Sequence, residues 1–251
     1  MLEVKNLSVR VNERTLLQDV SFSVLEHMWL MVVGPNGAGK TTLVNAVTQG
    51  LPYEGDVRFD GKDIASLKSA ELAKSVGVLT QSHPVAYSFT VEEVVRLGRY
   101  AYTKGMFSTR SDEDDKKVEE ALTITGMQSC RTQSVLTLSG GELQRAFLAQ
   151  VFAQDPRLLI LDEPTNNLDF VYQKQVFELI REWAKRPGRA VMSVVHDLAL
   201  ARAYGTHAIL LDGGNLIASG TAKDALSREN LQKVYSVDVF QWMKDMLSLW
   251  V

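Results

Sequence analysis

A lysine and two threonines close a glycine-rich segment that directly follows a short apolar run. The segment comprises Gly34, Pro35, Asn36, Gly37, Ala38, Gly39, Lys40, Thr41 and Thr42. Residues 28–33 have the composition of a buried strand and residues 42–47 the apolar spacing of a helix, which is the context that the G-x-x-x-x-G-K-[ST] motif requires. The glycines let backbone N–H groups converge on phosphate oxygens at a helix N-terminus. Lys40 would reach the β- and γ-phosphates and Thr41 a Mg²⁺ ion. The structural alternative is an ordinary glycine-rich turn.

Two carboxylates stand directly after another apolar run, residues 158–161. Asp162 would hold Mg²⁺, directly or through water, and Glu163 would orient or deprotonate the attacking water. A bare carboxylate is a modest base, so the site must exclude water and neutralise phosphate charge to make it effective. Acidic residues also end many ordinary strands, so the assignment depends on pairing with the glycine-rich segment.

A second glycine pair opens the helix predicted to run from about residue 140 to residue 153. Ser139 and Glu142 fit a capping box, which is a complete structural explanation for those two residues. Capping does not require Gly140 and Gly141, because each glycine costs roughly 1 kcal/mol in a helix interior and somewhat less in the first turn. Their N–H groups and the Ser139 hydroxyl are better explained as a second phosphate-binding surface. A second copy of the chain would complete such a site most simply.

The elements that must position these residues follow from apolar periodicity and turn residues. Residues 2–11 and 16–24 predict two antiparallel strands. Further strands are expected at 28–33, 56–59, 75–79, 158–161 and 190–195, helices at 68–74, 90–99, 111–125, 171–185, 198–204, 223–226 and 229–234, and a hairpin at 208–219. The acids at 111–115 are expected to form a capped, solvated helix start. Residues 239–251 predict a terminal strand packed on the body or part of a contact surface.

Composition limits the class of protein. With 251 residues and 45% hydrophobic content, the chain can bury one α/β domain with a subdomain. The net charge of −3, from 27 basic and 30 acidic residues, excludes a globally basic surface for nucleic acid. Cys130 is the only cysteine, which excludes an intramolecular disulfide and fits a reducing compartment. We expect no signal peptide and no bilayer-spanning run, so a membrane role would come through a partner.

Taken together, the motifs resemble those of ATP-binding cassette (ABC) ATPases over essentially the whole chain. Residues 34–42 resemble the family's Walker A motif, Gln81 its Q-loop, residues 138–144 its signature, residues 158–163 its Walker B motif, residues 167–169 its D-loop, and His196 with Asp197 its switch histidine. The resemblance implies a P-loop NTPase core of α/β class with an N-terminal antiparallel β subdomain and an inserted α-helical signature subdomain. The implied division is one domain, 1–251, in which 1–81 and 154–251 form the core and 82–153 the helical subdomain.

The resemblance also implies ATP and Mg²⁺ as ligands and a nucleotide-sandwich dimer. In that dimer Ser139, Gly140 and Gly141 of one copy would contact the γ-phosphate held by Lys40 of the other. His196 would contact the γ-phosphate and the attacking water, and Gln81 would sense Mg²⁺ and couple to a partner. Asp169 would belong to the nucleotide site as well, although it could simply start the following helix.

One position departs from the family pattern. The family usually places an aromatic residue just after the first strand, where its ring stacks on adenine, and here Val11 occupies that place. Apolar contact from valine supplies less interaction than a ring. We therefore predict weakened but not abolished nucleotide affinity.

Residues 91–100 point to a class of transporter. With their Gly98–Arg99 pair, they resemble the segment after the Q-loop in importer ATPases for siderophores, haem and cobalamin, although an ordinary amphipathic helix ending at Gly98 is the alternative. The implied protein hydrolyses ATP at the cytoplasmic face of the membrane, with a separate permease and, indirectly, a substrate-binding protein. The alternatives are another transporter class, including exporters, or a soluble ATPase switch in DNA repair or translation. Repair members carry long coiled-coil insertions and translation members two cassettes, and neither fits this chain.

Overall fold

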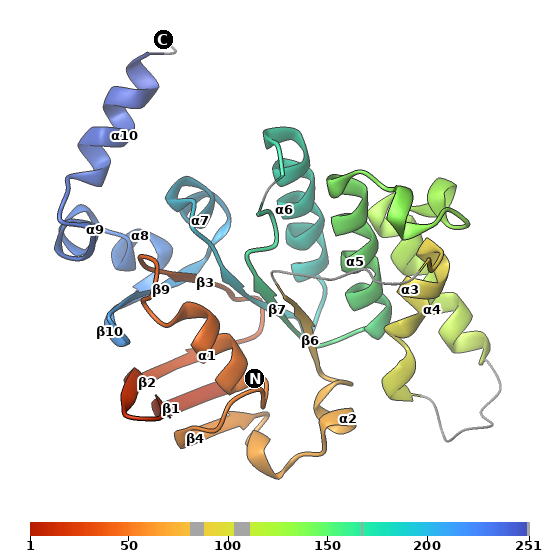
Figure 1. Cartoon of the computed structure of the whole chain (residues 1–251), viewed down its shortest axis with the longest axis horizontal. Coiled ribbons are helices and arrows are strands. Elements are labelled where there is room, and N and C mark those ends of the chain that lie inside the picture. The colour runs from red at the N-terminus through yellow and green to blue at the C-terminus, as the bar shows by residue number, and fades with distance from the viewer. Residues whose placement is uncertain (81–87, 103–110, 167, 250–251) are drawn as a thin grey trace. The chain divides into compact units, whose positions relative to one another are not determined.

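The computed structural model describes residues 1–80, 88–102, 111–166 and 168–249, which fall into two compact units. The first unit contains residues 1–65 and 192–251, and the second contains residues 66–191 (Figure 1). The chain leaves the first unit in the 3-10 turn η1 (Ile64–Ser66) and returns to it within strand β8 (Ala190–Val194). In the described parts of the chain, no helix combines the length and apolar character needed to cross a membrane.

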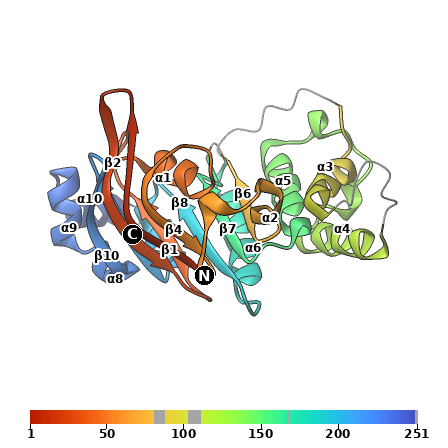
Figure 2. The same cartoon turned by 90° about the horizontal axis from the view of Figure 1, so that it is seen from below.

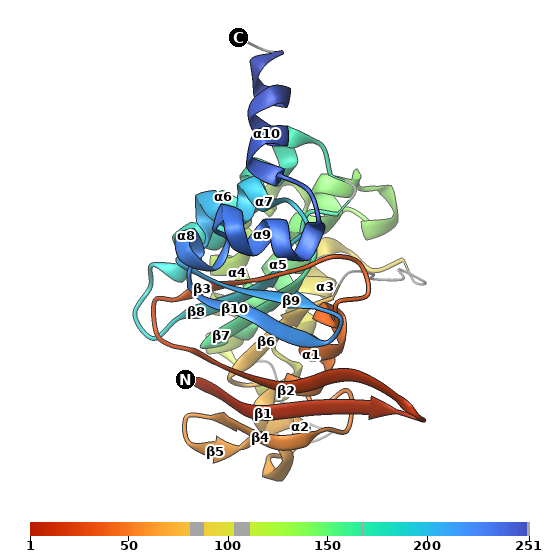
Figure 3. The ribbon, with the colours of Figure 1, turned by 90° about the vertical axis from the view of Figure 1, so that its left-hand side faces the viewer.

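An antiparallel sheet forms the N-terminal part of the first unit (Figure 3). Its strands, in the order β2-β1-β4-β5, are β1 (Leu2–Val11), β2 (Arg14–Val24), β4 (Glu54–Phe59) and β5 (Lys62–Asp63). Alternate residues of β1, including Leu2 and Val4, are buried, as the period of a half-buried strand requires. The predicted antiparallel pair is confirmed, and β2 begins at Arg14 because a two-residue turn joins the strands.

The remaining strands of the first unit hold a parallel pair and a hairpin. Strand β3 (Trp29–Val33) runs parallel to β9 (His207–Asp212), which pairs antiparallel with β10 (Asn215–Thr221). Gly213 and Gly214 form the turn with φ angles of 49° and 83°, the positive values that a tight two-residue hairpin turn favours. The predicted hairpin is confirmed, with both strands longer than expected. The helices of this unit are α1 (Lys40–Val47), α7 (Leu198–Tyr204), α8 (Ala222–Ala225), α9 (Arg228–Tyr235) and α10 (Val239–Ser248).

The second unit combines a parallel strand pair with a group of helices (Figure 2). Strands β6 (Val76–Leu79) and β7 (Leu158–Asp162) are paired in parallel and fully apolar except at the end of β7. The helices are α2 (Ser69–Leu72), α3 (Val91–Leu97), α4 (Asp112–Thr125), α5 (Gly140–Gln154) and α6 (Phe170–Ala184), with 3-10 turns η2 (Tyr100–Tyr102), η3 (Gln128–Cys130) and η4 (Val135–Thr137). α5 lies beside both α3 and α4 and buries Leu148 and Phe152.

Two sequence predictions need correction. The strand considered for residues 239–251 is wrong, because residues 239–248 form helix α10. Asp238 caps this helix by accepting a hydrogen bond from the Gln241 N–H at 3.1 Å. The helix start at 111–115 is capped by Ser111 as predicted. It is not merely solvated, however, because Asp114 accepts a hydrogen bond from Arg99 Nε at 2.7 Å and Asp115 pairs with Arg96.

Candidate nucleotide site

The glycine-rich loop between β3 and α1 leaves no room for side chains at two of its glycines. A Cβ atom at Gly34 would overlap the carbonyl oxygen of Leu211. At Gly39, where φ is 100°, a Cβ would lie 2.6 Å from Cδ2 of Leu17. At Gly37, φ is 80° but the surrounding space is open, so conformation alone favours glycine. The loop backbone therefore has the tight curvature that an N–H cradle for phosphate requires.

Lys40 is the first residue of α1 and lies against this loop. Its side chain is only 6% exposed, and Nζ donates hydrogen bonds to the carbonyl oxygens of Gly34 at 2.8 Å and Pro35 at 2.9 Å. The ammonium group thus crosses the loop opening at the N-terminal end of the helix, where the helix dipole also favours an anion. Thr41 is exposed beside it and Thr42 is half-buried. This arrangement of Lys40 and the loop suits a bound triphosphate.

The β9–β10 turn supports the loop, which the sequence did not predict. The Gly214 N–H donates to the Ala38 carbonyl at 3.2 Å, and the Gly214 carbonyl accepts from the Gln18 N–H at 2.9 Å. A Cβ at Gly214 would lie 2.7 Å from the carbonyl oxygen of Leu16. The turn therefore fixes the phosphate loop to β2.

Two further predicted residues, His196 and Val11, belong to the first unit. The Val195 N–H donates to the Val32 carbonyl at 3.2 Å, so His196, which is exposed, follows directly beside the strand that leads into the loop. Val11 ends β1 opposite Arg14 and is 41% exposed. Its exposed apolar side chain is available for contact with a ligand, but it offers no aromatic face.

In the second unit, Asp162 and Glu163 stand at the carboxyl end of β7. Asp162 is the last strand residue and is 3% exposed. Glu163 has a φ of 53°, a left-handed conformation that is uncommon for a residue with a long side chain. Asn166 restrains it, because Asn166 Nδ2 donates to Glu163 Oε2 at 3.1 Å and the Asn166 N–H donates to the Glu163 carbonyl at 3.1 Å. Strain of this kind concentrates at functional sites, where the surroundings hold the residue in place.

The predicted capping box of α5 is confirmed. The Glu142 carboxylate accepts hydrogen bonds from the Ser139 N–H at 2.9 Å and the Ser139 hydroxyl at 2.7 Å. The Ser139 side chain and backbone hydrogen bonds lower the pKa of Glu142 below its ordinary value. Ser139 and Gly140 are exposed at the start of this helix, whereas Gly141 is buried.

Gly141 is explained by packing rather than by exposure. A Cβ there would lie 2.5 Å from Cγ of Tyr172, whereas a Cβ at Gly140 would lie 3.9 Å from the nearest heavy atom, on Leu168. The signature segment and the start of α6 are therefore in direct contact. Asp169 caps α6 by accepting a hydrogen bond from the Tyr172 N–H at 3.0 Å, which confirms the capping interpretation. Gln81 and Asn167 lie outside the described residues.

The Gly98–Arg99 pair packs α3 against α5. A Cβ at Gly98 would overlap the carbonyl oxygen of Gln150. Arg99 is 5% exposed and donates from Nη1 to the Ala153 carbonyl at 2.9 Å, which satisfies a C-terminal carbonyl of α5. Its guanidinium lies 3.8 Å from the ring centroid of Tyr102.

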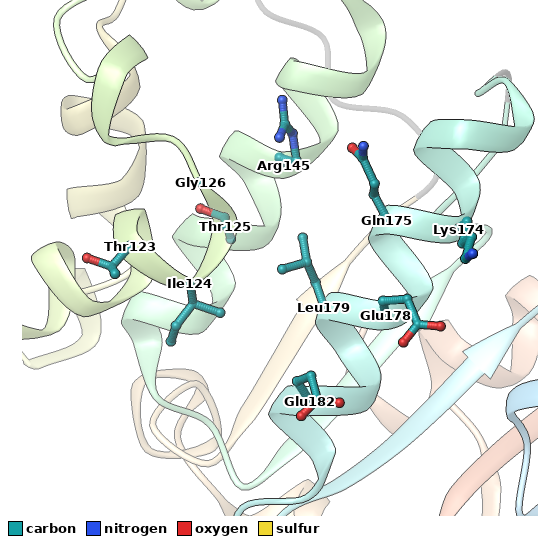
Figure 4. Close-up of a pocket in the computed structure, with 10 residues that line it drawn as sticks. All are labelled: Thr123, Ile124, Thr125, Gly126, Arg145, Lys174, Gln175, Glu178, Leu179 and Glu182. Carbon is teal, nitrogen blue, oxygen red and sulfur yellow. The ribbon is translucent and has the colours of Figure 1, made fainter.

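A cavity of about 450 Å³ lies between the end of α4 and α6 in the second unit (Figure 4). Ile124 and Leu179 give it an apolar lining, and Arg145 stands at its edge. The Arg145 Nε atom is buried and has no hydrogen-bond partner in the described parts of the chain. No predicted site residue lines this cavity.

The acidic side chains also show how the protein could hold the predicted Mg²⁺ ion. Among residues 1–80, 88–102, 111–166 and 168–249, no three histidine, cysteine or acidic side chains are grouped to hold an ion. Mg²⁺ usually keeps several waters and is bound through one or two carboxylates together with substrate phosphates. The predicted donors are the Thr41 hydroxyl, the Gln81 side chain and the Asp162 carboxylate, and a set with one carboxylate is of the kind that binds Mg²⁺ together with phosphate oxygens.

Comparisons with known proteins show what the chain is similar to. A family model described as ABC transporter matches residues 17–166. The chain is 42% identical to the hemin import ATP-binding protein HmuV of Streptomyces coelicolor, covering 93% of this chain and 83% of that protein. It is 33% identical to the ferric enterobactin transport ATP-binding protein FepC of Escherichia coli, covering 94% and 87%.

A further relative is longer. The ABC transporter ATP-binding protein YvrA of Bacillus subtilis is 38% identical over 95% of this chain, which spans about half, 54%, of YvrA. Among solved structures, a dimeric post-hydrolysis state of the ATP-binding cassette MJ0796 bound to ADP and Pi is similar with a TM-score of 0.76 and 26% identity. That similarity covers 89% of this chain and 99% of the cassette.

Proposed function

Because the chain belongs to the ABC transporter family, we propose that it is the ATP-hydrolysing subunit of a membrane importer. The observation that carries this proposal is the loop in which Lys40 bridges the carbonyls of Gly34 and Pro35 at 2.8 and 2.9 Å. A buried lysine at the positive end of a helix, beside a loop without room for side chains, is arranged for a phosphate group.

Each predicted residue then has a role toward ATP. The loop N–H groups and Lys40 bind and orient the phosphates. Thr41 and Asp162 hold Mg²⁺, with Gln81 contributing to that ion, and the ion neutralises phosphate charge when bound. Glu163 accepts a proton from the attacking water or fixes its orientation. His196 contacts the γ-phosphate, and Val11 contacts adenine.

The second phosphate surface acts in trans. Ser139, Gly140 and Gly141 of a second copy contact the γ-phosphate held by Lys40, and Asp169 lies at the same junction. The capped start of α5 supports this proposal because Ser139 and Gly140 are exposed within one chain. The Ser139 hydroxyl, which now donates to Glu142 at 2.7 Å, must turn toward the phosphate to contribute.

The cargo is a metal chelate, meaning haem, a siderophore complex or cobalamin. The proposal rests on the names of the relatives, which are a hemin import and a ferric enterobactin transport ATP-binding protein. The protein acts as a peripheral subunit at the cytoplasmic face of the cell membrane, with a separate permease and, indirectly, a substrate-binding protein. The division into a core, residues 1–81 and 154–251, and a helical subdomain, residues 82–153, stays part of this proposal.

Glu163→Gln tests the hydrolytic assignment. We expect ATP turnover to fall by a factor of at least about 100, while ATP binding persists and an ATP-bound dimer accumulates on size exclusion. Glu182→Gln is the matched control, because it removes a carboxylate that pairs with Lys185 on the surface of α6. A Glu163→Gln protein that stays monomeric in saturating ATP and still turns over would contradict the proposal.

A further inference from the structure

Helix α10 separates apolar and polar residues onto two faces. Its polar residues, Gln241, Lys244, Asp245 and Ser248, share one side. Val239, Trp242, Met246 and Leu249 follow one another at intervals of three, four and three residues, the spacing of a coiled-coil seam. This apolar side, with these four residues, is called the α10 seam below.

Most of the α10 seam is open to solvent. Val239 is buried at the start of the helix, but Trp242 is 61% exposed, Met246 46% and Leu249 77%. The figures show α10 leading away from α9 toward the C-terminus (Figures 1 and 3). An exposed apolar face of this kind on an otherwise well-packed unit marks an interaction surface.

The base of the helix is fixed in place. Arg228 Nε donates to both carboxylate oxygens of Asp238 at 3.0 Å. The Arg202 guanidinium lies 5.0 Å from the ring centroid of Phe240. The direction of α10 is therefore set by α9 and α7, and the seam is presented as part of the fold of the first unit.

The α10 seam adjoins the predicted nucleotide face. Trp242 and Met243 line a cavity of about 800 Å³ together with His196 and Asp197, at the start of α7. In the proposed function His196 contacts the γ-phosphate that two copies enclose. The surface around that histidine thus continues directly onto the exposed helix.

We propose that the α10 seam pairs with the α10 seam of a second copy of this chain, extending the interface of the ATP-bound dimer. This inference rests on the proposed function and names a contact surface that the nucleotide motifs do not include. A seam without charges is self-complementary, as the two-fold interface of a homodimer requires.

The size of the helix explains why the pairing accompanies the nucleotide-bound dimer. α10 has ten residues and is therefore about 15 Å long. One face of such a helix covers much less than the roughly 800 Å² per partner of a stable interface. The α10 seam therefore strengthens a dimer whose main contact lies at the nucleotides.

Site-directed disulfide formation tests the pairing in the full chain. Cys130→Ser removes the only native cysteine, and Glu163→Gln holds ATP. In this background, Met246→Cys, or Trp242→Cys mixed with Met246→Cys, should form an intermolecular disulfide under mild oxidation with ATP and Mg²⁺. If the two α10 helices pair in parallel, the disulfide should form between two Met246→Cys chains. If they pair antiparallel, it should form between a Trp242→Cys chain and a Met246→Cys chain. Lys244→Cys, on the polar face, is the matched control and should remain monomeric on non-reducing gels.

The two proposals can fail separately. An ATP-dependent dimer without a disulfide in either combination, or with equal disulfide formation at position 244, would overturn the α10 pairing and leave the shared nucleotide site intact. A disulfide at the seam without an ATP-dependent dimer would support the pairing and contradict the sandwich. Absence of both would overturn both.

A second measurement does not depend on cysteine chemistry. The variant Trp242→Ser/Met246→Ser, in the Glu163→Gln background, should need about ten times more protein to reach half-dimer at saturating ATP. Gln241→Ala/Lys244→Ala should leave that concentration unchanged. Equal dimerisation of the seam variant would overturn the pairing, since the seam contacts would then contribute nothing.

Discussion

Gly141 lies against the ring of Tyr172 so closely that a Cβ at position 141 would be 2.5 Å from the ring carbon Cγ. The contact joins the first turn of α5 to the first turn of α6, immediately after Asp169. The first turns of α5 and α6 are therefore packed together, and the position of the exposed α5 N-terminus depends on a ring in α6.

Gly141→Ala tests this contact. The added methyl group must displace the Tyr172 ring or α5, so we expect a loss of about 1–3 kcal/mol in the free energy of unfolding and a fall in ATP turnover. Gly140→Ala is the matched control, because its Cβ would lie 3.9 Å from its nearest neighbour. It should be neutral or slightly stabilising in urea unfolding, and equal destabilisation of both variants would contradict the packing argument.

Complementation tests the shared nucleotide site. Ser139→Arg should abolish turnover while leaving ATP binding to Lys40 of the same chain, and Lys40→Ala should lose ATP binding. An equal mixture should regain roughly a quarter of the wild-type rate, because half of the dimers are mixed and each mixed dimer has one intact site. A mixture that stays inactive, despite dimer formation, would show that the two surfaces do not act in trans.

Val11→Tyr tests how adenine is held. A ring at the end of β1 should tighten ATP binding by roughly 3- to 10-fold, in line with about 0.5–1.5 kcal/mol for an aromatic contact. Ile217→Tyr is the control, because Ile217 and Val11 are each 41% exposed and Ile217 lies in β10. Unchanged affinity, measured by isothermal calorimetry, would mean that another residue already binds the base.

Asp155 predicts a specific acid sensitivity. Burial acts to raise the pKa of Asp155, but hydrogen bonds from Lys117 and Arg189 outweigh it, so that the pKa lies below its ordinary value. The resulting stabilisation is fully present above the ordinary pKa of about 4 and is lost as the pH falls through the lower folded-state pKa. Asp155→Asn should therefore reduce the free energy of unfolding by about 1–2 kcal/mol at pH 7, and the difference from wild type should shrink toward pH 3. A difference that stays constant across this range would contradict the charge-based explanation.

The parts of the site that were predictable from sequence are those fixed by local chemistry. The helix caps at Ser111 and Ser139 each depend on a side chain and an N–H group three residues later, and both are present. The glycine loop was recognisable because its glycines stand at a fixed spacing within a few residues, where the backbone must turn tightly around a phosphate.

What sequence reasoning missed depends on distant contacts or on exposure. Gly214 supports Ala38 from far along the chain, and no local pattern identifies that hydrogen bond. The left-handed backbone of Glu163 is likewise imposed by the turn that contains Asn166. The helix at 239–248 was missed even though the three- and four-residue spacing of Val239, Trp242 and Met246 indicated it.

The Gly213–Gly214 turn has a practical consequence for engineering the protein. Short glycine turns between two strands are usually permissive places to insert a tag or to open a circular permutant. Here the turn connects by hydrogen bonds to both Ala38 and Gln18, so an insertion would act on the phosphate loop itself. We therefore expect an insertion in this hairpin to weaken nucleotide binding, even though the hairpin lies far from the glycine-rich motif in sequence.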